Sequence, residues 1–266
     1  MKISTPWYER FQPVLLAALG ILVVVWLALT PPGLLGKADA IGYAVCHRIA
    51  ERSFFLGDRA VPLCSRCSGM YLGALAGFLF QLRLGKRANL PPRRVQAFFA
   101  VFLLAFALDG INSYITFFPQ LPHLYDPQNS LRLLTGTLLG VGMTGLLLPT
   151  FHQVVWQQWD ERPALGSIRQ LIGVVVLAGV IAGSIASENP LLVYPLALLS
   201  IASLLALLVT AYSLVWTLLL KRENTFTTWK QLRPVLVLAI LTTFTQIAAI
   251  DAFRYWLTGT WNGFSL

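Results

Sequence analysis

The sequence predicts an all-α fold, a polytopic bundle of about seven transmembrane helices with a Cys/His-bearing loop on its outer face. Hydrophobic residues make up 56% of the 266 residues and charged residues 12%, about half the charged share of an ordinary soluble domain. The mean hydropathy is +0.68, and the apolar residues gather in runs of about twenty, the length of a membrane-spanning helix. These observations exclude a soluble globular enzyme, a disordered chain and a disulfide-rich secreted domain.

Seven apolar segments form the predicted spans. The first is long for the apolar core of a signal peptide and no small-residue cleavage site follows it, so we expect a retained helix. The second is the shortest and carries charges at both ends. In chain order the segments lie at about 13–30, 66–82, 95–117, 131–150, 168–187, 191–219 and 234–257.

The charge distribution predicts the orientation. With a cytoplasmic N-terminus, the inner segments hold 13 of the 20 basic residues and four of the 11 acidic ones, so the whole net charge of +9 falls inside, as expected for short loops near anionic lipid. Aromatic residues do not alternate with the basic runs, which argues against nucleic-acid binding. We expect a multi-pass cell-membrane protein with the lipid bilayer as its partner and the Cys/His loop and C-terminus outside. The substrate and the oligomeric state stay open.

All three cysteines lie in or just after one predicted outer loop, residues 31–65. Cys46 directly precedes His47, while Cys64 and Cys67 form a C-x-x-C motif at the start of the second span. Thiolates and imidazole are the ligands that zinc and other soft transition metal ions prefer, which predicts a metal site from these four residues. Adjacent Cys and His rarely bind one ion, so one of Cys46 and His47 is expected to stand apart, with His47 as a ligand or a proton carrier. Two alternatives remain, a redox C-x-x-C motif and an inert disulfide with one free thiol.

A second polar group is predicted inside the membrane. Asp109 lies in the outer third of the third span, with Asn112 on the same helix face. An intramembrane carboxylate is costly unless it is paired or hydrated, and Arg132 near the start of the fourth span is its expected partner. We predict Asp109 as a general base or a support for the metal ligands, Arg132 as a binder of an anionic group, and His47 as a third catalytic candidate.

Glycines at four-residue spacing predict how these helices meet. The second span carries Gly69, Gly73 and Gly77, and the fourth carries Gly136 and Gly140. Such small-residue stripes let membrane helices approach closely. Close packing of the second, third and fourth spans would gather the polar residues at the outer face.

The stretches CHRIAERSF, PLCSRCSGMYLG, LDG and NSLRLLTGTLLG resemble domain of unknown function 2085 (DUF2085), a family of predicted membrane proteins. The resemblance covers about residues 43–150, and the PLC-x-RC-x-G-x-Y-x-G segment is its most specific part. It implies a membrane protein and the same site but no reaction. The chain departs from the family in the Pro-bearing stretch FFPQLPHLYDPQ and in three extra helices. Matching positions are Cys46, His47, Arg52, Ser53, Pro62, Cys64, Arg66, Cys67, Gly69, Tyr71, Gly73, Asp109, Gly110, Asn129, Arg132, Thr135 and Gly136.

The remaining polar residues are weaker candidates. Asp251 lies near the end of the last span, in a position similar to that of Asp109 in the third span. Arg254 on the same helix could pair with Asp251. The role of Asp251 stays open. His123 in an outer loop is a candidate for an extra metal ligand, and His152 is expected at the inner interface. The chain is predicted to divide into an N-terminal membrane helix with its linker, a family-like core and a C-terminal three-helix extension, at residues 1–40, 41–150 and 151–266.

Three functions compete. The first is a metal-dependent hydrolase or transferase acting on a lipid-linked or exported substrate. The second is a membrane thiol oxidoreductase that uses Cys64 and Cys67. The third is a transporter or metal-handling protein with Asp109 and Arg132 along its path, although too few spans carry polar residues for a charged pathway. The sequence contains no nucleotide-binding loop, H-E-x-x-H motif or dinucleotide fingerprint.

Overall fold

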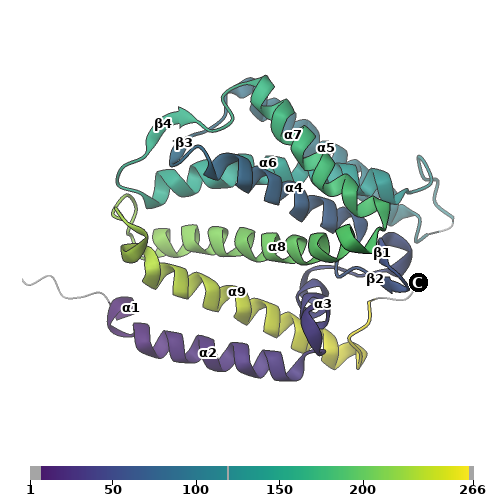
Figure 1. Cartoon of the computed structure of the whole chain (residues 1–266), viewed down its shortest axis with the longest axis horizontal. Helices are drawn as coiled ribbons and strands as arrows, with labels where there is room; N and C mark the ends of the chain where they lie inside the picture. Colours follow the sequence, from purple (N-terminus) through teal and green to yellow (C-terminus); the bar gives the residue numbers. More distant parts are fainter. Residues whose placement is uncertain (1–6, 119, 264–266) are drawn as a thin grey trace, which may run out of the picture.

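The computed structural model describes residues 7–118 and 120–263, which fold into long helices laid side by side (Figure 1). Short strands and 3-10 turns connect them at both ends of the bundle. The elements are α1 (Trp7–Arg10), α2 (Gln12–Leu29), α3 (Gly33–Val45), η1 (Ala50–Arg52), β1 (Phe55–Leu56), β2 (Arg59–Ala60), α4 (Ser65–Leu82), β3 (Arg87–Asn89), α5 (Arg93–Ile115), α6 (Asn129–Val155), β4 (Asp160–Pro163), α7 (Ile168–Gly183), η2 (Ser184–Ser187), α8 (Pro190–Leu219) and α9 (Trp229–Thr258).

Six helices in the described part of the chain are long and apolar enough to cross a membrane. They confirm the predicted all-α membrane bundle. The predicted second span coincides with α4, whose 18 residues would reach about 27 Å at 1.5 Å per residue. It is less apolar than the others because it carries Arg66 and several small polar residues, so the count of seven spans stays a prediction. The six are α2, α5, α6, α7 with η2, α8 and α9.

The expected loop at 31–65 contains a helix, α3, that was not predicted. The segment looks polar because it carries charged residues, among them Asp39. In the structure Asp39 is buried, since Arg48 pairs with it at 2.8 Å and Arg59 also bonds its carboxylate. This pairing lets α3 pack against α8 and α9. The predicted divisions of the chain at residues 40 and 150 fall within α3 and α6.

Glycines bring α4 and α6 into backbone contact, as their spacing predicted. A Cβ added at Gly136 would lie 2.1 Å from the Arg66 carbonyl oxygen, and one at Gly140 would lie 1.9 Å from that of Met70. The approach is reciprocal, because a Cβ at Gly73 would lie 2.2 Å from the carbonyl oxygen of Thr137. Small residues on both helices therefore fix the first turns of α6 beside the start of α4, and α5 packs on α6.

The ends of the bundle differ in what closes them. At one end β1 and β2 form a short antiparallel hairpin beside α3, and at the other β3 pairs in parallel with β4 (Figure 1). One core cluster lies among α2, α3, α8 and α9 and includes Cys46, Cys64, Trp26 and Ile247. The cysteines are therefore part of the packed interior.

Candidate functional site

Two helix ends bring the cysteines together. Cys46 follows the last residue of α3, Cys64 precedes the first residue of α4, and Cys67 lies in the first turn of α4. Gly42 makes this possible, because a Cβ there would lie 2.2 Å from the carbonyl oxygen of Pro62. Cys46, His47 and Cys64 each offer a ligand atom within 4.8 Å of the other two, and Cys67 lies close enough to Cys46 and Cys64 for their side chains to act on its thiol. The predicted metal-ligand candidates therefore converge.

The sulfur of Cys46 lies at the centre of the group of thiols. Its sulfur accepts hydrogen bonds from the backbone N–H groups of Arg48 (3.5 Å) and Cys64 (3.3 Å). The thiol of Cys64, and then that of Cys67, lowers the pKa of Cys46 well below its usual value, while the same contact with Cys46 raises the pKa of Cys64 to about 12. Cys46 is the sulfur best prepared to be a thiolate.

His47 is held in one tautomer. The Ile49 backbone N–H donates to Nδ1 at 3.0 Å, so the proton of the neutral ring must be on Nε2. Burial, the largest effect, lowers the pKa of His47 and keeps the ring neutral. In this arrangement Nε2 can donate a proton or a hydrogen bond, and a metal ion at Nδ1 would first have to displace the Ile49 amide.

Asp109 is buried as predicted, but its expected partnership with Arg132 is wrong. Arg66 donates through Nε to Oδ2 at 3.0 Å and also through Nη2 to the same oxygen. Tyr125 donates its hydroxyl to Oδ1 at 2.9 Å, and Thr135 reaches Oδ2 at 3.4 Å. Arg66 lies between the two cysteines of the C-x-x-C motif, and its long side chain crosses from α4 to α5. Spacing along a helix does not show how far such a side chain reaches, so the sequence pattern does not reveal Arg66 as the partner of Asp109.

Arg132 has neutral partners instead. Its guanidinium donates to Asn129 Oδ1 at 2.9 Å and to Ser113 Oγ at 2.8 Å, and its buried Nε has no partner among the described residues. Arg52 lies nearby with its guanidinium 4.0 Å from the centre of the Phe117 ring. Within the described ranges, this arrangement leaves Arg132 without a carboxylate partner.

The three arginines share one electrostatic environment. Arg52, Arg66 and Arg132 all act to lower the pKa of His47, and Arg66 acts to lower that of Arg52. Within this group Asp109 is the carboxylate that forms an ion pair. The site therefore has more positive than negative charge in a largely buried place. Arg52 and Arg66 belong to the family-like motif, which is the signal that could have identified them.

The other predicted candidates lie elsewhere. His123 is exposed and bonds Asp126 at 3.1 Å, and His152 is buried at the far end of α6, where Trp156 donates to its Nδ1 at 3.0 Å. Arg254, the expected partner of Asp251, acts on it electrostatically, while its guanidinium forms hydrogen bonds with other groups. It donates to two backbone carbonyls of the cysteine region, those of Tyr43 and Cys46.

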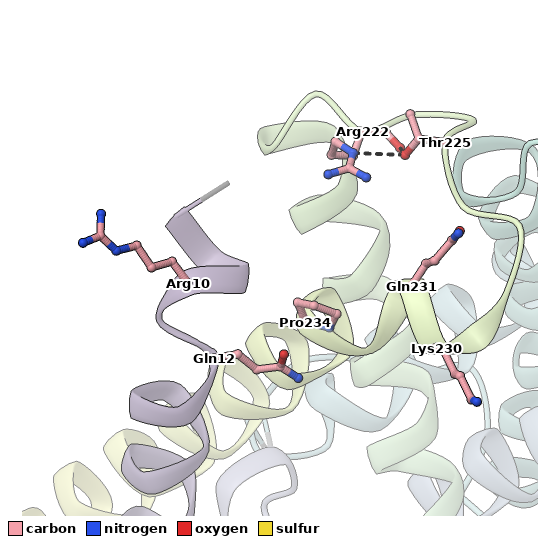
Figure 2. A pocket seen from close by; sticks show the side chains of 7 residues that line it. All are labelled: Arg10, Gln12, Arg222, Thr225, Lys230, Gln231 and Pro234. Atoms are coloured by element: carbon pink, nitrogen blue, oxygen red, sulfur yellow. Dashed lines mark hydrogen bonds between the residues drawn. The ribbon is translucent and has the colours of Figure 1, made fainter. Parts of the chain in front are cut away.

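A separate basic pocket of about 590 Å³ is shown in Figure 2, and the elements that form it lie at the opposite end of the bundle from β1 and β2 (Figure 1). It is formed by the start of α2, the α8–α9 connection and the start of α9. Arg222 donates to Thr225 at 3.2 Å within it. Its basic residues are among those from which the orientation was predicted, and that orientation stays a prediction. The lining residues are Arg10, Gln12, Arg222, Thr225, Lys230, Gln231 and Pro234.

Comparison with known proteins identifies the family. Residues 46–146 match the family of predicted membrane proteins DUF2085. An uncharacterized protein of Methanothermobacter thermautotrophicus is 37% identical over 111 residues, which is 42% of this chain and 91% of that protein. The chain belongs to the DUF2085 family. An uncharacterized protein of Methanocaldococcus jannaschii is 28% identical over 121 residues, 45% of this chain and 72% of that protein.

The DUF2085 match encloses the site. It begins at Cys46 and contains His47, Arg66, Asp109 and Arg132, whereas Asp251 and the basic pocket lie outside it. No solved structure matches the chain. Family membership and the six apolar helices together make this chain a membrane protein.

Proposed function

We propose that the DUF2085 core is a metal centre beside an anion-binding site, serving a hydrolytic or transfer reaction on a lipid-linked or exported substrate. Cys46, Cys64 and Cys67 would hold zinc or a similar transition metal ion. The observation that carries the proposal is the meeting of three thiols with three arginines, of which one is paired with a carboxylate of the described residues. We also propose that this site lies at the outer face of the membrane.

The donor set fits a soft metal ion. Three sulfurs lie together at two helix ends, and the sulfur of Cys46 already accepts two backbone amides. Metal binding would release the protons of Cys64 and Cys67. A divalent ion on three thiolates has a net charge of about −1, which the neighbouring arginines would stabilise.

The charge balance supports an anionic substrate. Buried charges are costly unless they are paired, and Arg132 has neutral partners and, among the described residues, an unbonded Nε. Guanidinium groups bind phosphate and carboxylate through paired hydrogen bonds. Arg52 and Arg132 would therefore bind an anionic group of the substrate.

Two further residues would have supporting roles, one in positioning a side chain and one in proton transfer. Asp109 receives hydrogen bonds from Arg66, Tyr125 and Thr135, so we assign it the role of a positioning residue for Arg66 rather than that of a general base. The Nε2–H of His47 would supply a proton to the leaving group. The bound ion would supply Lewis-acid activation.

The experiment is metal analysis of detergent-purified variants. Wild-type protein should carry about one zinc or iron ion per chain, and Cys46→Ser, Cys64→Ser and Cys67→Ser should each lose most of it. His123→Ala, which removes a histidine outside the cluster, is the matched control and should keep the ion. A metal-free wild type, or cysteine variants with full metal content, would overturn the proposal.

Inorganic phosphate and pyrophosphate probe the anion site. Isothermal titration of wild-type protein should show saturable binding that Arg132→Gln weakens about tenfold, the loss expected from one charge-assisted bond of about 1.4 kcal/mol. Arg10→Gln, in the distant basic pocket, is the control. Equal losses for the two variants would contradict the assignment of the anion to Arg132.

One observation favours the alternative of a thiol oxidoreductase. Cys64 precedes the 18-residue helix α4 and Cys67 lies in its first turn, where the helix dipole favours a thiolate. The same preparations decide between the two functions. A protein with no metal, one free thiol and a reducible Cys64–Cys67 bond would support the oxidoreductase.

A further inference from the structure

A cavity of about 800 Å³ is lined by residues of α2, α9 and the segment after α9; the two helices run side by side in Figure 1. Its walls are apolar and aromatic, and its volume is that of a small-molecule site. Asp251 is the charged residue among the described side chains that line it. The lining residues are Leu22, Val25, Trp26, Leu29, Thr30, Ala248, Asp251, Ala252, Tyr255, Trp256 and Trp261.

Asp251 is poorly compensated for a buried carboxylate. Its exposure is 2%, its Oδ2 accepts one hydrogen bond from the Trp26 indole at 2.9 Å, and its Oδ1 has no hydrogen-bond partner among the described residues. Arg254, one turn further along α9, acts on Asp251 electrostatically but donates hydrogen bonds from its guanidinium to the carbonyls of Tyr43 and Cys46. A single neutral donor does not offset the burial of a carboxylate.

The contact with Trp26 shows that this arrangement is built into the fold. Trp26 is the buried residue of α2, whose other described side chains are largely exposed on the surface of the bundle. Its indole joins α2 to α9 across 225 residues of sequence. The carboxylate is thereby held at the wall of the cavity.

We propose that this cavity binds a compact lipophilic ammonium ion. The positive group would lie on the Asp251 side of the cavity and add to the electrostatic effect of Arg254 on a carboxylate whose Oδ1 accepts no hydrogen bond from the described residues. Its apolar body would pack on the aromatic side chains of Tyr255, Trp256 and Trp261. The faces of these rings also attract a cation, so they would favour the charged end of the ligand as well. The aliphatic side chains of α2 form the facing wall, and they are Leu22, Val25 and Leu29.

Depth supports a compact ligand rather than a lipid headgroup. Asp251 lies seven residues before Thr258, the last residue of α9, or about 10 Å along the helix. The charge would therefore lie about two turns of helix before the end of α9. A ligand with a small charged end and a rigid apolar body fits this position.

Two probes of equal shape test the proposal in dodecyl maltoside micelles. Benzyltrimethylammonium carries the charge, and neopentylbenzene is its neutral isostere. Isothermal titration of full-length protein should show saturable binding of the ammonium, and a tenfold excess of the isostere should not displace it. The Asp251→Asn variant should bind the ammonium at least tenfold more weakly, because an amide keeps the shape and the Trp26 contact but loses the charge.

Two further variants separate charge from packing. Asp160→Asn, at an aspartate of β4 outside the cavity, is the matched control and should bind like wild type. Trp261→Ala should weaken binding several-fold through the lost ring. Equal binding by Asp251→Asn, displacement by the isostere, or no saturable binding to wild type would each overturn the proposal. Should Asp251→Asn fail to fold, the two probes on wild-type protein decide it.

Discussion

Asp109 and Asp251 are both buried to 2% exposure near the ends of long membrane helices, yet their surroundings differ. Asp109 receives donors from Arg66, Tyr125 and Thr135. Asp251 receives one donor, from Trp26, and its other oxygen has no hydrogen-bond partner in the described part of the chain. In the family core, residues of the protein donate hydrogen bonds to both oxygens of the carboxylate. In the α2–α9 region, one carboxylate oxygen is left for a ligand to contact.

The packing around the two carboxylates differs in the same way. Near Asp109, glycines bring α4 and α6 into backbone contact. Near Asp251, α2 and α9 meet through the Trp26–Asp251 hydrogen bond and line the 800 Å³ cavity beside it. Glycine contacts thus hold the helices of the first region together, whereas the second region has an open cavity beside its carboxylate.

The largest expected effect is from breaking the Arg66–Asp109 pair. Arg66→Ala should lower the free energy of unfolding by about 3–5 kcal/mol, because it leaves a buried carboxylate without its cation. The Arg66→Ala/Asp109→Asn double variant should lose less than the sum of the single losses. SDS titration of detergent-solubilised protein measures these values. Additive losses would show that the two side chains do not depend on each other.

A smaller loss is expected from the helix contact. Gly140→Ala places a Cβ against the backbone of α4 and should cost about 3 kcal/mol by forcing α4 and α6 apart. Gly173→Ala on α7 meets no atom within 4 Å and should stabilise the helix slightly, by up to about 1 kcal/mol. Thermal unfolding of the two variants side by side checks this. Equal effects would mean that the glycine contact does not hold the core.

Asp251→Asn should be nearly neutral when no ligand is bound. The amide oxygen still accepts the Trp26 N–H, and a carboxylate with one neutral donor loses little on neutralisation, so the free energy of unfolding should change by less than about 1 kcal/mol. Asp109→Asn should cost clearly more, although less than Asp109→Ala, because an amide still accepts hydrogen bonds from Arg66. SDS titration compares the three variants. Similar losses for the two Asn variants would remove the distinction between the two regions.

Reporter fusions test the predicted orientation of the helices and should leave the stability of the protein nearly unchanged. Fusions after Lys86 and after His123 lie in the connections at the two ends of α5. They should report opposite sides of the membrane, with His123 outside. The same side for both would separate the cysteine cluster from the outer face.

Much of the fold could be predicted because bilayer-length apolar runs and glycine spacing are local properties of the chain. The burial of Asp109 and the grouping of the cysteines followed from the same patterns. The partner of Asp109 did not, because Arg66 reaches it across a helix interface that no spacing describes. The helix α3 was missed because Asp39 finds its partners only in the folded chain, and the contact between Trp26 and Asp251 is equally nonlocal.

The central claim is that Cys46, Cys64 and Cys67 bind one metal ion. X-ray absorption spectroscopy at the metal edge of purified wild-type protein tests it most directly. For zinc, we expect three sulfur ligands at about 2.3 Å and one lighter ligand. A shell of nitrogen and oxygen ligands with no sulfur would contradict the claim.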